Sequence, residues 1–124
     1  MVTINEMKHQ TDLPVLISDD QGLIIYVNEC FSKIFEWEFA DIVGKSIITI
    51  IPNSYHDSHN LGFARFAMTE QSRVLNHPLQ LMAVTKNGRE ILSEHFITAE
   101  QQEGQWIFAA ILRPLENISS VSLN

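Results

Sequence analysis

Two histidines, His56 and His59, lie three residues apart in the segment "IPNSYHDSHNLGFARF", which spans residues 51–66. A neutral imidazole nitrogen can bind a metal or a haem iron, and the ring can also donate or accept a hydrogen bond. This spacing on a helix is poor for a shared zinc ion, and the single cysteine, Cys30, leaves no Cys-rich set of ligands to complete it. Two alternatives therefore remain: one of the two histidines binds a haem iron, or both are helix residues that bond to backbone or water.

Composition and charge limit the classes of function. The 124 residues, 45% of them hydrophobic, suit one domain with one core. A formal charge of −7 without a basic cluster argues against nucleic acid as a partner. No apolar run approaches the roughly 20 residues of a membrane helix, and the first residues lack the pattern of a signal peptide. We therefore expect a cytoplasmic domain without direct membrane insertion, whose parent protein can still be membrane-anchored.

The first third of the chain predicts a β-hairpin followed by a helix. Residues 14–28 contain two short apolar runs joined by Asp-Asp-Gln-Gly, which is a typical hairpin turn. Asn28 can cap a helix over residues 29–37, because its side chain can accept from free amides of the first turn. Phe31 and Phe35 share one face of that helix.

Short helices and then strands are predicted for the rest. A short helix ends at Gly44, a helical turn ends at Pro52, and the longest helix covers about 54–68. Three strands then follow in a meander. They cover residues 74–85, 90–99 and 105–113, with turns at 86–89 and 100–104.

This order of elements predicts an α+β domain in which a five-stranded antiparallel sheet carries helices on one face. It resembles the PAS sensory domain over roughly residues 12–114. The resemblance rests on "PVLISDDQGLIIYVNECFSKIFEW", on "DIVGKSIITIIP" and on "TKNGREI", in that order. We divide the chain into an N-terminal cap segment (1–12), a PAS domain (13–114) and a linker toward an output domain (115–124).

The PAS resemblance implies a sensory or regulatory module of a larger signal-transduction protein. The output would be a kinase, a nucleotide cyclase or a similar domain of the same polypeptide, and the module itself would not be an enzyme. The residues agree, because the sequence shows no nucleophile set, no carboxylate pair in an apolar setting and no Gly-rich phosphate loop.

The segment 51–66 is similar to the haem-binding oxygen-sensor subgroup of PAS domains. Pro52, Tyr55 and His59 match that subgroup's spacing, which implies that His59 would be the proximal ligand if haem b binds. Arg65 matches an arginine that reaches a haem propionate in those sensors. The chain departs from the subgroup at Leu79, where the oxygen sensors have a distal arginine.

His95 is a second departure, because the oxygen sensors have an apolar residue there. It would serve as a distal ligand, as a hydrogen-bond donor or as a polar contact for a smaller molecule. Flavin is less favoured than haem, because the Asn-Cys-Arg motif of photoreactive PAS domains is absent and Cys30 is on the wrong helix.

Period-two alternation places one set of strand residues on the face that the long helix covers. We expect these residues to line one cavity with the helix residues. Together with Arg65, the candidate binding residues are His59, Phe63, Phe66, Leu79, Leu81, Ile91, Ser93, His95 and Ile97.

An alternative function is a ligand-free dimerisation and signal-relay module. Its interior would be filled by aromatic and aliphatic side chains, namely Phe31, Phe35, Phe63, Phe66 and Ile97. The outer sheet face would then form the interface. We expect it to carry Leu92, Phe96, Trp106 and Phe108, and to form a homodimer together with Val2, Ile4 and Met7 of the N-terminal segment.

Overall fold

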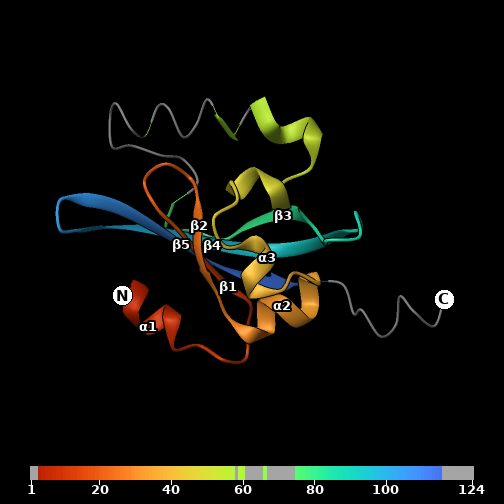
Figure 1. Ribbon diagram of the computed structural model, residues 1–124, viewed down its shortest axis with the longest axis horizontal. Helices are drawn as coiled ribbons and strands as arrows, with labels where there is room; N and C mark the ends of the chain where they lie inside the picture. Colours follow the sequence, from red (N-terminus) through yellow and green to blue (C-terminus); the bar gives the residue numbers. More distant parts are fainter. Residues whose placement is uncertain (1–2, 58, 61–65, 67–74, 116–124) are drawn as a thin grey trace.

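The computed structural model describes residues 3–57, 59–60, 66 and 75–115. Its elements, labelled in Figure 1 where there is room, follow the predicted order of strands, helices and strands. They are α1 (Ile4–Lys8), β1 (Val15–Ser18), β2 (Ile24–Val27), α2 (Glu29–Phe35), α3 (Phe39–Ile42), η1 (Ile47–Ile50), η2 (Asn53–Tyr55), β3 (Leu79–Val84), β4 (Glu90–Gln102) and β5 (Gln105–Pro114).

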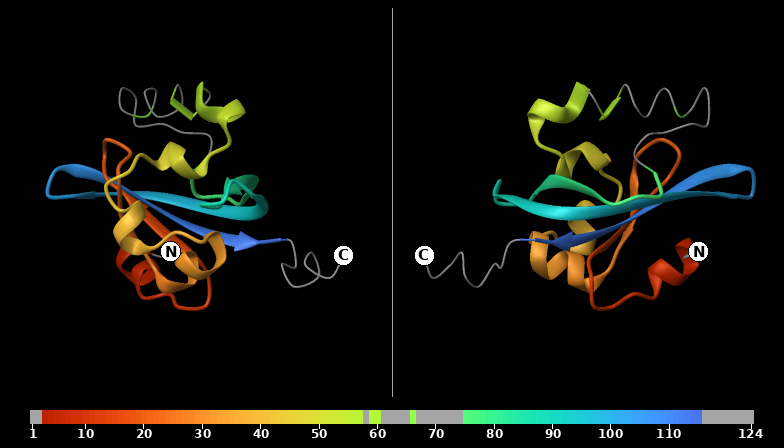
Figure 2. Two further views of the ribbon diagram at one scale, coloured as in Figure 1. Left: turned by 45° about the vertical axis from the view of Figure 1, so that its right-hand side comes forward. Right: turned by 180° about the vertical axis from the view of Figure 1, so that it is seen from behind.

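The strands form one sheet in the order β2-β1-β5-β4-β3, and each neighbouring pair is antiparallel. The predicted five-stranded α+β fold is confirmed. η1 and η2 lie on one side of the sheet and α1 lies on the other (Figures 1 and 2). The predicted long helix near 54–68 is helical at residues 56–57, 59–60 and 66, and its other residues lie outside the described part. No helix in the described ranges is long and apolar enough to cross a membrane.

Asn28 joins the first hairpin to α2. Its Oδ1 accepts from the amides of Val15 (3.0 Å) and Phe31 (2.9 Å), so it caps the helix as predicted. Its Nδ2 donates to the carbonyls of Gln10 (2.9 Å) and Leu13 (2.8 Å). One buried side chain therefore fixes the chain that leads into β1 against the start of α2.

Two apolar clusters lie on opposite faces of the sheet. We call inner the face on which Leu16, Ala110 and Leu112 pack with Phe31 of α2, in the larger cluster. On the outer face, the smaller cluster is formed by Val15, Ile17 and Ala109 with two residues of α1, Ile4 and Met7. The N-terminal segment covers the outer face as expected, although Val2 lies outside the described residues. The prediction of helices on one face concerns the elements after β1, and α1 belongs to the N-terminal segment that was expected on the outer face.

Trp106 and Phe108 lie on the inner face, and their predicted outer placement is wrong. They share the parity of Ala110 along β5, and Ala110 belongs to the inner cluster. Both rings contact Phe66, at centroid distances of 5.0 Å for Trp106 and 5.1 Å for Phe108. Phe96 pairs with Ile111 on the outer face, as predicted.

β4 and β3 differ from their predicted bounds. β4 continues to Gln102, and the turn contains only Glu103 and Gly104, whose φ angles are 53° and 81°. Two positive φ angles are typical of the two-residue hairpin turn that matches strand twist. β3 begins at Leu79 instead of residue 74, because Pro78 has no amide to donate to a neighbouring strand.

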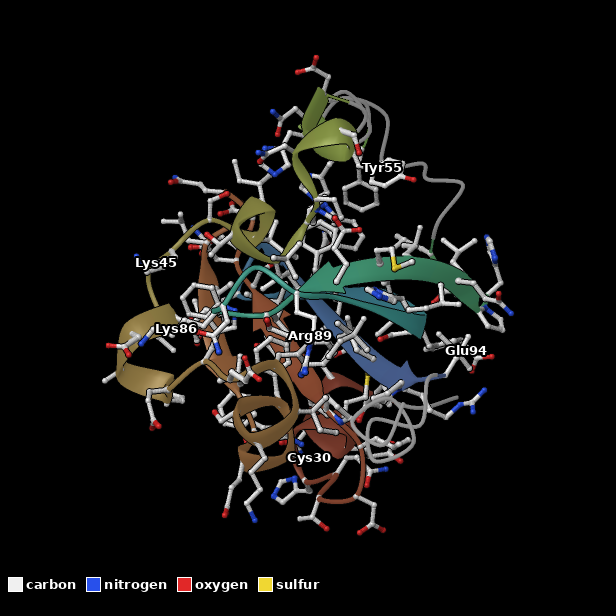
Figure 3. All side chains as sticks on the ribbon, turned by 90° about the vertical axis from the view of Figure 1, so that its right-hand side faces the viewer. Cys30, Lys45, Tyr55, Lys86, Arg89 and Glu94 are labelled. Atoms are coloured by element: carbon white, nitrogen blue, oxygen red, sulfur yellow. The ribbon has the colours of Figure 1, made fainter. Side chains whose placement is uncertain are left out.

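The β3–β4 hairpin is tied to the α2–α3 connection. The Glu36 carboxylate accepts from Asn87 Nδ2 (2.7 Å) and pairs with Arg89 Nη2 (3.3 Å). Lys86 Nζ pairs with Asp41 Oδ2 at 3.0 Å. Figure 3 labels Lys86 and Arg89 on this side of the molecule. These pairs are largely exposed and contribute little energy individually, but together they hold the hairpin that carries the candidate site.

Candidate functional site

The centre of β4 presents two buried polar side chains to the inner face. Ser93 is fully buried and His95 is 8% exposed. His95 pairs with Leu79 of β3 and with Leu112 of β5, so its ring lies between two leucines. Because Leu112 belongs to the inner cluster, the predicted inward orientation of His95 is confirmed.

His95 presents a lone pair instead of a proton. Its Nε2 is buried, and it has no hydrogen-bond partner within the described part of the chain. Burial lowers the pKa of His95 to about 4, while a hydrogen bond to the Leu81 backbone opposes that shift. A bond that favours the protonated ring is donated by the ring to a carbonyl, and since Nε2 has no partner we assign the ring proton to Nδ1. The neutral ring therefore exposes Nε2 as an acceptor at neutral pH.

Ser93 adds a second acceptor on the same strand. Its hydroxyl donates to the Ile91 carbonyl at 3.4 Å, so lone pairs of the hydroxyl oxygen remain available. Ser93 pairs with Leu81 of β3, whose side chain is 41% exposed although it has inner-face parity. The inner face is thus accessible from the β3 edge, close to both acceptors.

No formally charged side chain has inner-face parity on the described strands. This follows from the register of the antiparallel pairs, in which cross-strand partners share a face. On β3, β4 and β5 the inner residues are Leu79, Leu81, Ala83, Ile91, Ser93, His95, Ile97, Ala99, Gln101, Trp106, Phe108, Ala110, Leu112 and Pro114.

The structure places the predicted site residues in three groups. The first group lies together on neighbouring inner-face positions of β3 and β4. It comprises Leu79, Leu81, Ser93, His95 and Ile97. The second group comprises Ile91, which belongs to the main core with Phe31, and Phe66, which packs on Trp106 and Phe108.

His59 forms the third group with two residues that lie outside the described part, Phe63 and Arg65. His59 is helical and half-buried. Burial lowers its pKa most strongly, the nearby His56 adds to that shift, and a side-chain hydrogen bond with Asn60 opposes it. Its role as an iron ligand therefore rests on the sequence alone.

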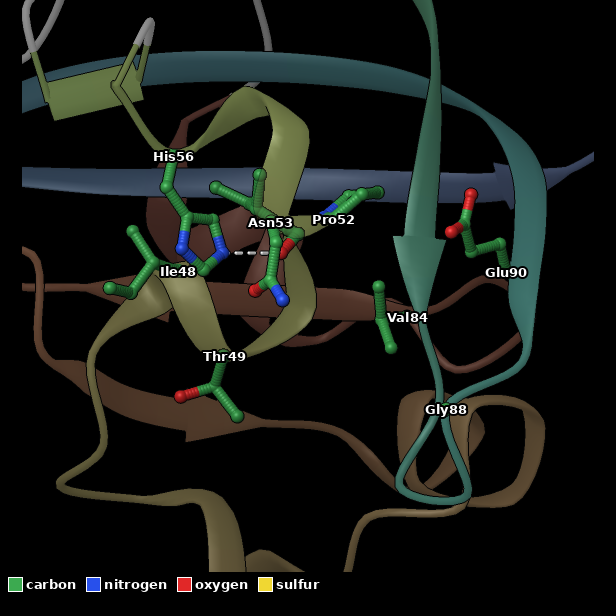
Figure 4. A pocket seen from close by; sticks show the side chains of 9 residues that line it. Ile48, Thr49, Pro52, Asn53, His56, Val84, Gly88 and Glu90 are labelled. Carbon is green, nitrogen blue, oxygen red and sulfur yellow. Dashed lines mark hydrogen bonds between the residues drawn. The ribbon is translucent and has the colours of Figure 1, made fainter.

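A hollow of about 500 Å³ lies at a different place, between η1, η2 and the β3–β4 hairpin (Figure 4). None of the candidate binding residues from the sequence lines it. The residues that do are Ile48, Thr49, Ile51, Pro52, Asn53, His56, Val84, Gly88 and Glu90. His56 donates from Nε2 to the Ile51 carbonyl at 2.6 Å, so it folds back onto the preceding turn instead of facing solvent. No periodic pattern marks this hollow in the sequence, because turns supply most of its wall.

The described residues do not support haem. Haem carries propionates, and the inner face described above has no cation to meet them. A metal ion held by protein side chains alone is a separate case, and in the described ranges no three His, Cys, Asp or Glu side chains are close enough together to hold one. His59 does not line the hollow, and the proposed propionate partner Arg65 lies outside the described residues.

The sheet order, the helices that cover it and the buried polar side chains of β4 describe an α+β domain with a polar centre on its inner face. A model of the PAS domain family matches residues 12–113, and the chain therefore belongs to that family. It is a sensory signalling module.

Known proteins resemble this chain in sequence or in fold. An uncharacterized protein from Azorhizobium caulinodans is 25% identical over 104 residues, which are 83% of this chain but only 14% of that protein. A PAS domain structure from Desulfitobacterium hafniense has a TM-score of 0.71 at 18% identity, covering 90% of this chain and 99% of that one. The LOV domain of a blue-light activated histidine kinase from Erythrobacter litoralis has a TM-score of 0.63 at 12% identity, covering 87% and 100%. At these identities, the structural likeness concerns the fold.

Proposed function

We propose that this domain is the sensory input module of a larger signalling protein and binds a small molecule on the inner face of β4, with His95 at the base of the site. The main observation in support of this proposal is the buried Nε2 of His95, which has no hydrogen-bond partner within the described residues. Leaving such an atom unsatisfied costs about 1–3 kcal/mol. A ligand that bonds to Nε2 recovers that energy, so the site favours an occupant.

The larger protein is inferred from the comparisons. The chain spans 14% of the length of its Azorhizobium relative, which supports a module within a longer polypeptide. The similar LOV domain is part of a histidine kinase. We infer an output of the same general kind, a kinase or a cyclase, that the PAS module regulates.

The signal would leave through β4 and its neighbours. On the outer face of β4, Glu100 Oε2 accepts from the Ile4 amide of α1 at 2.7 Å. Next to β4, β5 leads to Leu115, whose amide donates to the Leu92 carbonyl of β4 at 2.9 Å. A ligand at His95 that shifts β4 would therefore act on α1 and on the exit of the chain together. The ligand changes the output only if it binds the shifted position of β4 more tightly than the unshifted one.

A fragment screen by two-dimensional ¹H–¹⁵N NMR tests the proposal. We expect fragments that stabilise the wild-type domain and shift the amides of Leu79, Leu81, Ser93 and Ile97. The same fragments should bind His95→Phe at least about tenfold more weakly, because one hydrogen bond to a buried acceptor is lost. Hits that all map to the hollow beside η1, or no hits at all, would contradict the proposed site.

The alternative, a ligand-free dimerisation module, is favoured by the outer face. Leu92 and Phe96 are only partly buried there, while α1 covers the region near Glu100. The homodimer remains a prediction, now without Trp106 and Phe108. Light scattering on the NMR samples separates the two functions, since a stable dimer that binds no fragment would favour the alternative.

A further inference from the structure

We propose that the ligand of the β4 site is a small uncharged molecule with an apolar body and one O–H or N–H group, which donates to Nε2 of His95. This inference rests on the proposed function, and it adds the chemical class of the ligand. It follows from three properties of the inner face: its hydrogen-bonding polarity, its charge and its apolar walls.

The polarity of the site selects a donor. Nε2 of His95 is buried without a partner in the described part of the chain, and with the ring proton assigned to Nδ1 its lone pair faces the site. The Ser93 hydrogen is used by the Ile91 carbonyl, which leaves acceptor capacity on its oxygen. A ligand group that only accepts would leave both atoms unpaired, and it would add its own desolvation cost.

The charge of the site selects a neutral molecule. The inner-face positions of the described strands carry no Asp, Glu, Lys or Arg. Glu94, next to His95 in sequence, points to the outer face and pairs with Arg113 at 3.1 Å. A buried ion without a counter-charge is strongly disfavoured, and the described strands offer none to a carboxylate or an ammonium group.

The walls of the site select an apolar body. His95 is flanked by Leu79 and Leu112 across the strands, and Ile97 lies two residues further on the same face. Leu81 is exposed beside Ser93, so an apolar ligand that covers its side chain gains burial.

Four probes of similar shape test this inference: phenol, toluene, benzoate and benzylammonium. Phenol presents one hydrogen-bond donor, toluene has no polar group, benzoate carries a negative charge and benzylammonium carries a positive charge. Their dissociation constants should be measured by NMR titration at pH 7.5 on the wild type, on His95→Phe and on Gln80→Ala. Gln80 is an exposed neighbour of Leu79 with outer-face parity, so its variant is the matched control.

We expect phenol to bind the wild type about tenfold more tightly than toluene, and benzoate and benzylammonium to bind more weakly than toluene. His95→Phe should reduce the ratio of phenol to toluene to about one, and Gln80→Ala should leave it unchanged. Toluene binding as tightly as phenol, or a preference for either ion, would overturn the inference while leaving a ligand-binding module. If no probe binds, the proposed function fails together with the inference.

Discussion

Replacing Asn28 with alanine should lower the free energy of unfolding by about 3–4 kcal/mol. The change removes four hydrogen bonds at once, to Val15, Phe31, Gln10 and Leu13. Asn28 is 7% exposed, so water cannot readily replace the lost partners. Chemical denaturation by urea, followed by tryptophan fluorescence, measures the loss.

Two variants control for the nature of this effect. Asn28→Asp keeps both acceptor bonds and the helix cap but loses the two donor bonds, so its loss of stability should be intermediate. Asn87→Ala removes one exposed hydrogen bond to Glu36 and should cost less than about 1 kcal/mol. A loss in Asn28→Ala no larger than that in Asn87→Ala would refute the role assigned to Asn28.

Acidification should destabilise the domain through His95. Its pKa is about 4 in the folded protein and about 6.5 in an unfolded chain. Between these values the unfolded chain binds more protons, so stability is present above pH 6.5 and is lost as the pH falls toward 4. The difference corresponds to about 3 kcal/mol. Urea denaturation at several pH values between 4 and 7.5 measures this dependence.

The variant His95→Phe should lose most of that dependence. It should also be about as stable as the wild type at pH 7.5, because the removal of the unpaired Nε2 offsets the loss of the hydrogen bond to the Leu81 carbonyl. A residual dependence of the same sign should remain, since burial also lowers the pKa of His59. Replacing the surface residue His9 with glutamine removes a histidine and leaves His95 in place, so this variant serves as the control. An unchanged slope in His95→Phe would show that His95 is not the group that titrates.

The features that the sequence predicted correctly are those with local causes. The first hairpin and the Asn28 cap follow from turn and capping residues whose partners lie nearby in the chain. The orientation of His95 follows from the alternation of side-chain direction along β4, where the buried positions Ile91, Ser93 and His95 recur every second residue.

The wrong placement of Trp106 and Phe108 has a physical reason. β5 is apolar at every position from 106 to 112, because both of its faces are covered. The outer face packs against α1, and the inner face packs against α2. Alternation is then invisible, and the parity is set only by pairing, as with Ala110 opposite Ile97.

Only part of the candidate site was accessible to the same reasoning. Leu79, Leu81, Ser93 and His95 were predicted on one face, and the structure brings them together across two strands. The acceptor state of His95 depends on a bond to the Leu81 backbone, which no residue pattern encodes. Likewise, the hollow beside η1 depends on how two turns meet the β3–β4 hairpin.

The central claim is that a ligand bonds to Nε2 of His95, and the ¹⁵N chemical shifts of that ring test it most directly. In the free domain at pH 7.5, we expect a protonated Nδ1 and an unprotonated Nε2. Saturation with phenol should move the Nε2 resonance toward lower frequency, as expected for a nitrogen that accepts a hydrogen bond, and leave Nδ1 nearly unchanged. A protonated Nε2 in the free domain, or an Nε2 resonance that does not respond to bound phenol, would contradict the account.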